Sequence, residues 1–338
     1  MGQLQGLRHH ADHHRLRAVA DAGGLPLSDG PGDRREVRRG VRGRVVIPYF
    51  PAEGGEYRLS LGLKVLQPAA WIEIDSNFAS ETAEKKRLLI ENRNGVFLAL
   101  PGSEAGQAEL IETLSAHLLE HHADRYSHTS EGLRVAATGE TVQPDPAAPL
   151  TAAASLVQED VLLLQPSSEG HRLVAGLLGF PTRWRLADKM GKALAGIHEP
   201  VPGYADRLSR QMDRLFAALT PERLLWRLNF SLLDNPSLHQ PGGHNDPNAG
   251  RGLTAGNIGE KLWFRVERQT LRLLPKTDTT VFTVRIHQAR LRDVVTTPER
   301  ARDLAAAIDG MSEGMRRYKS IPGFEAPLKA WLAVVAEG

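Results

Sequence analysis

The segment LWFRVERQTLRLL, residues 262–274, carries charged and amide side chains inside a sequence that otherwise predicts a strand. Side chains alternate between the two faces of a strand, so Arg265, Glu267 and Gln269 share one face, with Arg265 and Glu267 about 6.5–7 Å apart. Burying such groups is costly unless they are paired or used. The pattern therefore fits two interpretations: cross-strand ion pairing on a solvated face, or a polar cluster on the wall of a pocket.

A second strand-like segment, LLWRLNFSLL at residues 224–233, repeats this pattern. Arg227 and Asn229 share a face and alternate with Trp226, Leu228 and Phe230. The aromatic residues around the charges favour the pocket, although ion pairing on a solvated face is the commoner outcome for such strands. The sequence leaves open which face lies inside.

A histidine at the end of a predicted helix is the candidate metal ligand. In AGIHEPVPGY, residues 195–204, Pro200 and Pro202 each disfavour helical geometry in the residue before them, so the helix should end at or near His198. A fixed position suits a metal ligand, and it also suits an ordinary helix end. Spacing alone favours the structural role.

The composition excludes several classes of protein. The chain has 338 residues, with 41% apolar and 24% charged residues, which is typical of a soluble globular protein of one or two domains. A net charge of +2 is too small to indicate nucleic acid or an anionic membrane as the main partner. We predict a cytoplasmic protein, because we expect no secretory leader and no apolar run long enough to span a membrane.

The chain contains no cysteine. This excludes a disulfide, a cysteine-ligated iron–sulfur cluster, a thiolate-ligated haem and covalent haem attachment through a CxxCH motif.

The first part of the chain divides into an arm and a helical region. Residues 1–43 are rich in Arg and His and predict a flexible arm. Its HHADHH cluster could bind a metal adventitiously, but a solvated tail is the favoured interpretation. Residues 44–150 predict an α-rich region with an amphipathic helix at 106–122, and residues 145–155 predict a linker.

The remaining chain predicts an α+β fold. Strands at 161–165 and 172–180 are followed by helices at 185–198 and 204–219, then by strands at 224–233, 262–274 and 280–291. The order β-β-α-α-β-β-β with short connections indicates a PAS-like module over 156–295: an antiparallel five-stranded sheet with helices on one face. Residues 296–338 predict a C-terminal helical extension, which begins with Thr297 as N-cap and a proline at the first helical position.

The segments FPTRWRLADKMGKALAGIHEPVPGY, WRLNFS and RVERQTLRLLP…FTVRIH, in this order, resemble the haem-dependent oxidative N-demethylase α-subunit family. The resemblance covers most of residues 57–300. It implies a PAS-type domain that binds haem b non-covalently, with His198 as the proximal iron ligand because it is the only histidine of the helix pair. Glu199 or a backbone carbonyl would fix the tautomer of this histidine, and the residues that could pair with the haem propionates are Lys189, Arg183 and Arg272.

The resemblance also implies a reaction, the oxidation of a small methylated secondary amine, such as dimethylamine, to formaldehyde and a shorter amine. Glu267 would hold the amine as an ammonium or accept its proton, while Arg265, Arg227 and Gln269 polarise the site. Electrons would come from a separate reductase with flavin and an iron–sulfur cluster. Two alternatives stay open: a haem-based gas sensor without catalytic activity, and a domain without haem in which His198 only ends a helix.

Overall fold

The computed structural model describes residues 47–243 and 248–338. The predicted arm at residues 1–43, with its HHADHH cluster, lies outside the described residues. Within the described part of the chain, no helix combines the length and apolar character that a membrane span requires.

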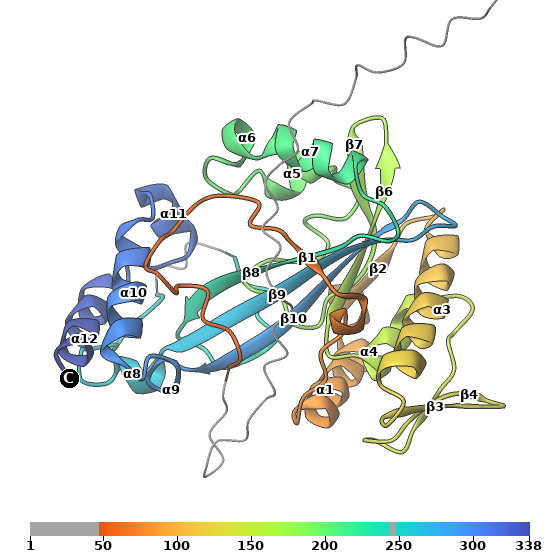
Figure 1. Ribbon diagram of the computed structural model, residues 1–338, viewed down its shortest axis with the longest axis horizontal. Helices are drawn as coiled ribbons and strands as arrows, with labels where there is room; N and C mark the ends of the chain where they lie inside the picture. Colours follow the sequence, from red (N-terminus) through yellow and green to blue (C-terminus); the bar gives the residue numbers. More distant parts are fainter. Residues whose placement is uncertain (1–46, 244–247) are drawn as a thin grey trace, which may run out of the picture.

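A large antiparallel sheet forms the centre of the molecule (Figure 1). Within the described residues it has seven strands in the order β1-β8-β9-β10-β6-β7-β2. The predicted mixed fold with an antiparallel sheet is confirmed, but the sheet is larger than the five strands expected, because two short strands from the predicted α-rich region join its ends. The strands are β1 (Lys64–Leu66), β2 (Phe97–Ala99), β6 (Asp160–Ser167), β7 (Gly170–Leu177), β8 (Leu224–Leu233), β9 (Trp263–Leu273) and β10 (Thr280–Arg290).

The long strands β8, β9 and β10 form where the sequence alternates β-branched, aromatic and polar residues. The turn at residues 275–278 joins β9 to β10, and the two strands pair along their whole length. Because each strand exposes alternate side chains on opposite faces, the register decides which polar residues of β8 and β9 meet.

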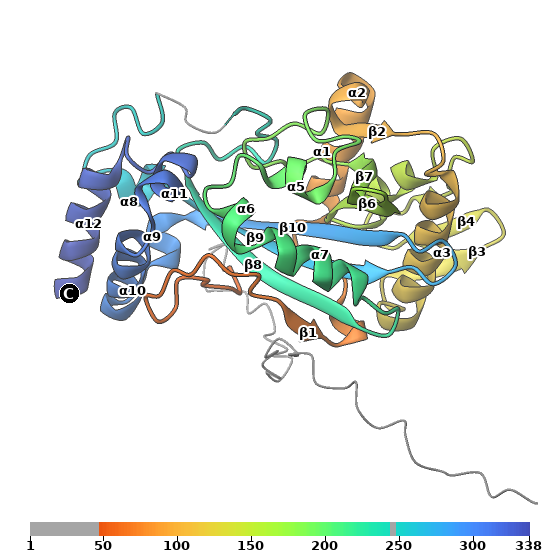
Figure 2. The same ribbon diagram turned by 90° about the horizontal axis from the view of Figure 1, so that it is seen from above.

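Helices cover the two faces of this sheet (Figure 2). On one face lie α5 (Leu194–His198), α6 (Tyr204–Arg207) and α7 (Ser209–Ala217), and we call it the α5–α7 face. Leu225 and Leu271 of the sheet belong to the core under these helices. The opposite face packs on Trp71, α1 (Phe78–Glu91) and α3 (Glu104–His121), and we call it the α1–α3 face.

The predicted helix at 185–198 is mostly wrong, since only its last five residues are helical. Gly191 adopts a left-handed φ of 79° and donates its N–H to the carbonyl of Leu173 in β7 (2.8 Å). Lys192 accepts from the N–H of the same leucine (3.1 Å). The chain therefore pairs with the sheet before it turns into α5, which ends at His198 as predicted.

Two further sequence predictions differ from the structure. The predicted helix at 204–219 divides into α6 and α7 at Leu208. The predicted linker at 145–155 contains the 3-10 helix η2 (Pro149–Ala152) and α4 (Ala153–Leu156), and Leu150 within it is fully buried. Its apolar side chains pack into the core of the α1–α3 face.

The C-terminal helices close the far end of the sheet, at the left of Figure 1. The start of α10 is as predicted, because the Thr297 hydroxyl accepts from the N–H of Arg300 (3.2 Å) and a proline follows it. Phe264 of β9 is buried among these helices. They are α8 (Ile258–Lys261), α9 (Leu291–Val294), α10 (Pro298–Asp309), α11 (Glu313–Tyr318) and α12 (Glu325–Glu337).

Smaller elements complete the described chain around the α1–α3 face. A separate antiparallel sheet with strand order β3-β4-β5 lies beside α3 (Figure 1). These elements are η1 (Pro68–Ala70), α2 (Arg93–Val96), β3 (Tyr126–Thr129), β4 (Gly132–Val135) and β5 (Thr141–Val142).

Candidate functional site

Polar side chains gather on the α5–α7 face of the two central strands. Arg227 lies opposite Gln269, and Asn229 lies opposite Glu267, so the four side chains point to the same side. His198, at the end of α5, is close enough for the Arg227 charge to lower its pKa. All five residues keep part of their surface accessible, although they lie under helices. We call them the polar patch.

The His198 ring is held in one orientation. Its Nδ1 lies 2.9 Å from the carbonyl oxygen of Leu194, which can only accept, so Nδ1 carries the proton. The ring also stacks on Tyr204 at 4.5 Å between centroids. Burial, together with the charges of Lys189 and Arg227, lowers the pKa of His198 to about 4, and the backbone hydrogen bond to Leu194 opposes this shift. The imidazole is therefore neutral at pH 7, with the lone pair on Nε2, the form that a metal ion binds.

Glu267 is the carboxylate of the polar patch. Its Oε2 accepts hydrogen bonds from Gln269 Nε2 (2.9 Å) and Asn229 Nδ2 (3.2 Å). Burial lowers the pKa of Arg227, and the charge of Glu267 raises it. Among the described residues, Arg227 Nε is buried without a hydrogen-bond partner. The patch thus retains a donor for a further, negatively polarised group.

Sequence reasoning missed Lys319, which reaches the patch from the segment that follows α11. Its Nζ donates to Asn229 Oδ1 (3.2 Å) and to the carbonyl of Phe230 (2.6 Å). Burial, together with the charge of Arg227, lowers the pKa of Lys319 to about 8, and the charge of Glu267 opposes this shift. No local pattern in the sequence pairs a lysine after α11 with β8. With His198 neutral, Arg227 and Lys319 give the neighbourhood of Glu267 an excess of positive charge.

Arg265 shares the face of Glu267 by register but has a structural role. The side chain is fully buried, and its guanidinium donates to Thr182 Oγ1 (3.0 Å) and Gln288 Oε1 (3.2 Å). It also donates to the carbonyls of Phe180 (2.8 Å) and Leu238 (3.0 Å). Arg265 therefore ties two loops to the sheet, and its donors are already engaged.

The structure separates the residues predicted to hold the propionates. Lys189 donates to the carbonyl of Ile197 and lies beside the polar patch, where it lowers the pKa of His198. Arg183 forms an ion pair with Asp234 (3.6 Å) near the loops that Arg265 ties.

Arg272 points to the opposite, α1–α3 face, with its guanidinium 4.4 Å from the Trp71 ring centroid. The alternation of β9 that places Glu267 and Gln269 under α5–α7 places Arg272 on the other side. The structure therefore brings Lys189, but not Arg272, to His198.

The α1–α3 face carries a second polar group, which sequence reasoning also missed. Arg285 pairs with Asp75 and Glu81, at 2.7 Å each, and Arg268 pairs with Glu73 at 3.0 Å. We call these five residues the ionic network. Both arginines are almost completely buried.

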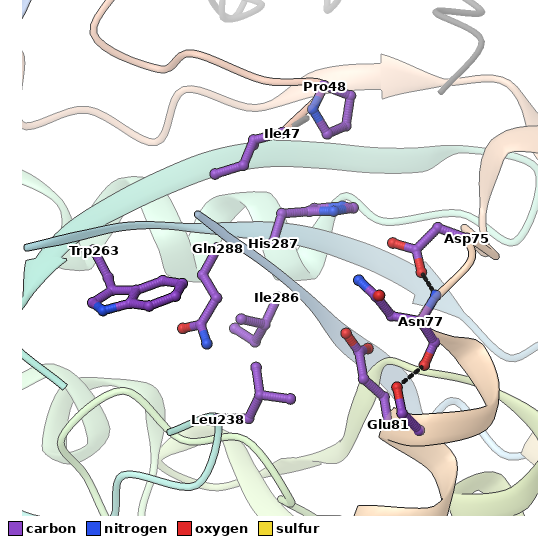
Figure 3. Close-up of a pocket in the computed structure, with 11 residues that line it drawn as sticks. Ile47, Pro48, Asp75, Asn77, Glu81, Leu238, Trp263, Ile286, His287 and Gln288 are labelled. Atoms are coloured by element: carbon purple, nitrogen blue, oxygen red, sulfur yellow. Dashed lines mark hydrogen bonds between the residues drawn. The ribbon is translucent and has the colours of Figure 1, made fainter. Parts of the chain in front are cut away.

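A cavity of about 230 Å³ lies at the edge of this network. In Figure 3, Trp263 lies across the cavity from Asn77 and Glu81, with His287 above. Its acidic residues, Asp75 and Glu81, already pair with Arg285. Within the described residues, no group of three or more His, Cys, Asp or Glu side chains could hold a metal ion. Because the acidic residues of this cavity already have partners, whereas Arg227 Nε in the polar patch has none among the described residues, the patch is the better candidate site.

Comparison with known proteins gives one result that covers most of the chain. Residues 62–329 match the family model described as haem-dependent oxidative N-demethylase, alpha subunit-like. The matched region contains the whole polar patch, the helices above it and Lys319.

Proposed function

The chain belongs to the haem-dependent oxidative N-demethylase alpha-subunit-like family, and from this premise we propose that it demethylates a small secondary amine similar to dimethylamine. The observation that carries the proposal is a neutral histidine, with Nε2 available, beside a carboxylate and an arginine with an unmet donor. The proposed cofactor is haem b, bound non-covalently. Electrons would come from separate reductase subunits with flavin and an iron–sulfur cluster, since this chain has no cysteine to hold such a cluster.

The residues of the patch fit a haem. His198 would hold the iron through Nε2, and Tyr204 stacks on a face of the same ring. The negative propionates would balance the excess positive charge of Arg227 and Lys319, with Lys189 beside them as a pairing partner. Arg183 and Arg272 do not enter this proposal, because they lie elsewhere.

We place this site in a PAS-like unit at residues 156–295, between the α-rich region at 44–150 and the C-terminal extension at 296–338. In support, the five strands of this unit are neighbours in the sheet, in the order β8-β9-β10-β6-β7. The segment between β7 and β8 supplies the helices over the patch.

Haem would supply the activation of dioxygen. In the balanced reaction, one oxygen atom is inserted into a C–H bond of the N-methyl group, and the other leaves as water. Two electrons from the reductase and two protons are consumed. The resulting carbinolamine breaks its C–N bond and yields formaldehyde and the demethylated amine.

Glu267 could either hold the amine as an ammonium ion or accept its proton, and the charges around it favour the second role. A methylated amine is an ammonium ion in water at pH 7, and the positive charges of Arg227 and Lys319 disfavour that form in the patch. Glu267 therefore acts as the proton acceptor that admits the neutral amine, and does not hold it as an ammonium. Gln269 and Asn229 hold the accepting carboxylate in place.

The first test is the absorption spectrum of the protein purified with haem supplied. The wild-type protein should show a Soret band, and His198→Ala should lose or strongly shift it. His128→Ala, in the exposed part of β3, is the matched control and should behave as wild type. A wild-type protein without the band would contradict haem binding, and an unchanged band in His198→Ala would contradict the ligand assignment.

The second test measures formaldehyde release from dimethylamine with an added electron donor. Glu267→Gln should lower turnover about 100-fold, the usual contribution of a positioned proton acceptor. Glu131→Gln, in an exposed turn, is the control. Normal turnover by Glu267→Gln would remove the proton acceptor, and haem binding without formaldehyde release would favour a gas sensor.

A further inference from the structure

The C-terminal end of α11 is fixed by its backbone. The N–H of Ser320 donates to the carbonyl of Arg317 (2.8 Å), and the N–H of Ile321 donates to the carbonyl of Arg316 (3.0 Å). Together with the left-handed φ of 57° at Ser320, these bonds form a Schellman motif. Lys319 is the last residue before this turn, so the position of its side chain is set by the end of the helix.

The Lys319 side chain lies at an edge of the sheet. The short strand β1 pairs with β8 only at residues 224–226 of the longer strand. Beyond them, Lys319 reaches the edge of β8, where it donates to the carbonyl of Phe230 and to Asn229 Oδ1. Only 7% of the residue is exposed. An ammonium group thus occupies part of the edge that β1 leaves uncovered.

This contact helps to fix the Asn229 amide. An ammonium group has donors and no acceptor, so the atom of Asn229 that faces Lys319 must be the carbonyl oxygen. The amide nitrogen then faces Glu267, to which it donates at 3.2 Å. Glu267 can only accept, so it favours the same orientation. Without the ammonium, the amide would lose the contact that holds its oxygen in place on β8.

We propose that Lys319 is a positioning residue, which acts through Asn229 to hold Glu267 as a hydrogen-bonded acceptor in the polar patch. The use of Glu267 as the proton acceptor rests on the proposed function, whereas the orientation of the amide does not. The C-terminal helical region, which the sequence predicts only as an extension, thereby completes the site.

The direct test observes the side-chain amide of Asn229 by NMR in protein with ¹⁵N-labelled asparagine. The signal is assigned by its absence from Asn229→Asp. Lys319→Met should shift the Asn229 amide resonances, because the amide loses the contact that holds it against Glu267. Lys329→Met, an exposed lysine of α12, is the matched control and should leave them unchanged. Unchanged resonances in a folded Lys319→Met would overturn the proposal.

The second test separates positioning from a structural role of the lysine. Lys319→Met should lower kcat about tenfold with a smaller change in KM, since a proton acceptor held slightly out of place slows the chemical step. Lys319→Arg, which keeps the charge and the donors, should restore much of the loss.

Asn229→Asp provides an independent variant if Lys319→Met does not fold. The aspartate still accepts from Lys319 but cannot donate to Glu267, so kcat should fall to a similar extent. A wild-type rate in Asn229→Asp would overturn the positioning. A wild-type protein without demethylase activity would instead contradict the proposed function, and the Asn229 resonances would still decide the role of Lys319.

Discussion

The two faces of the central strands hold buried charges in different ways. On the α1–α3 face, the arginines of the ionic network lie against carboxylates at 2.7–3.0 Å, and both are almost inaccessible. On the α5–α7 face, Arg227 Nε is buried without a hydrogen-bond partner among the described residues, although Glu267 is near enough to raise the pKa of Arg227. Here the polar residues remain partly accessible.

The difference separates charges that hold the fold from charges that are available for chemistry. A buried ion pair already has its counter-charge in place, and losing one partner leaves an uncompensated charge. The polar patch is partly accessible and lies beside the positive charges of Arg227 and Lys319. It can therefore bind a negatively charged partner without breaking another contact. Buried donors without a hydrogen bond occur on both faces, at Arg227 Nε and at Arg268 Nε and Arg285 Nε. The polar patch is therefore distinguished by its excess of positive charge and by the accessibility that its residues keep.

The largest expected effect comes from removing one arginine on each face. Arg285→Met leaves Asp75 and Glu81 buried without their counter-charge and should lower the free energy of unfolding by about 3–5 kcal/mol. Arg227→Met removes a guanidinium whose Nε has no hydrogen-bond partner among the described residues, and it should change the free energy of unfolding by less than about 1 kcal/mol. Urea unfolding followed by circular dichroism measures both.

A similar loss of unfolding free energy in Arg285→Met and Arg227→Met would contradict the proposed difference between the two faces. Arg87→Met is the control for a surface arginine, because this residue pairs with Glu84 and Glu91 on the exposed side of α1. Its stability should stay near that of wild type, as is usual for exposed ion pairs.

Acidification should act on the α1–α3 face. Burial alone would raise the pKa of Glu73. The hydrogen bond from His287 and the charge of Arg268 outweigh burial and lower this pKa to about 2. The folded state thus holds this carboxylate ionised where the unfolded state takes up a proton, so the stability that it contributes is present above pH 4.5 and is lost as the pH falls toward 2.

Glu73→Gln should therefore flatten the acid limb of the stability curve. The wild-type protein should lose about 2 kcal/mol more than this variant between pH 5 and pH 2, as measured by urea unfolding at each pH. Glu131→Gln, with an exposed side chain, should keep the wild-type slope. Equal slopes in wild type and Glu73→Gln would show that the network does not depend on this carboxylate.

Local patterns predicted the elements well where local forces decide the structure. Alternation in the sequence placed β8, β9 and β10 within about a residue of their ends, and the prolines placed the end of α5 at His198. The predicted helix at 185–198 failed because Gly191 and Lys192, in its middle, pair with β7, and this pairing overrides helix propensity.

The site was less predictable because its contacts are distant in the sequence. Arg265 and Glu267 lie on the same face of β9 because they are two positions apart in the strand. They differ because the Arg265 guanidinium donates to loop residues Thr182 and Phe180. Lys319 lies 90 residues from Asn229 in the chain, and Arg285 lies 204 residues from Glu81. No window of sequence contains either pair, so neither the support of the patch nor the ionic network could be predicted.

The smallest expected effect concerns the support of the polar patch. Ser320 adopts φ 57°, a left-handed conformation that costs a residue with a Cβ about 1 kcal/mol relative to glycine. Its buried Oγ also lacks a hydrogen-bond partner among the described residues. Ser320→Gly should therefore raise the free energy of unfolding by about 0.5–1 kcal/mol, with the Asn229 amide resonances unchanged. A destabilised Ser320→Gly would show that this turn is not strained, and shifted resonances would show that the serine itself helps to hold Lys319 against β8.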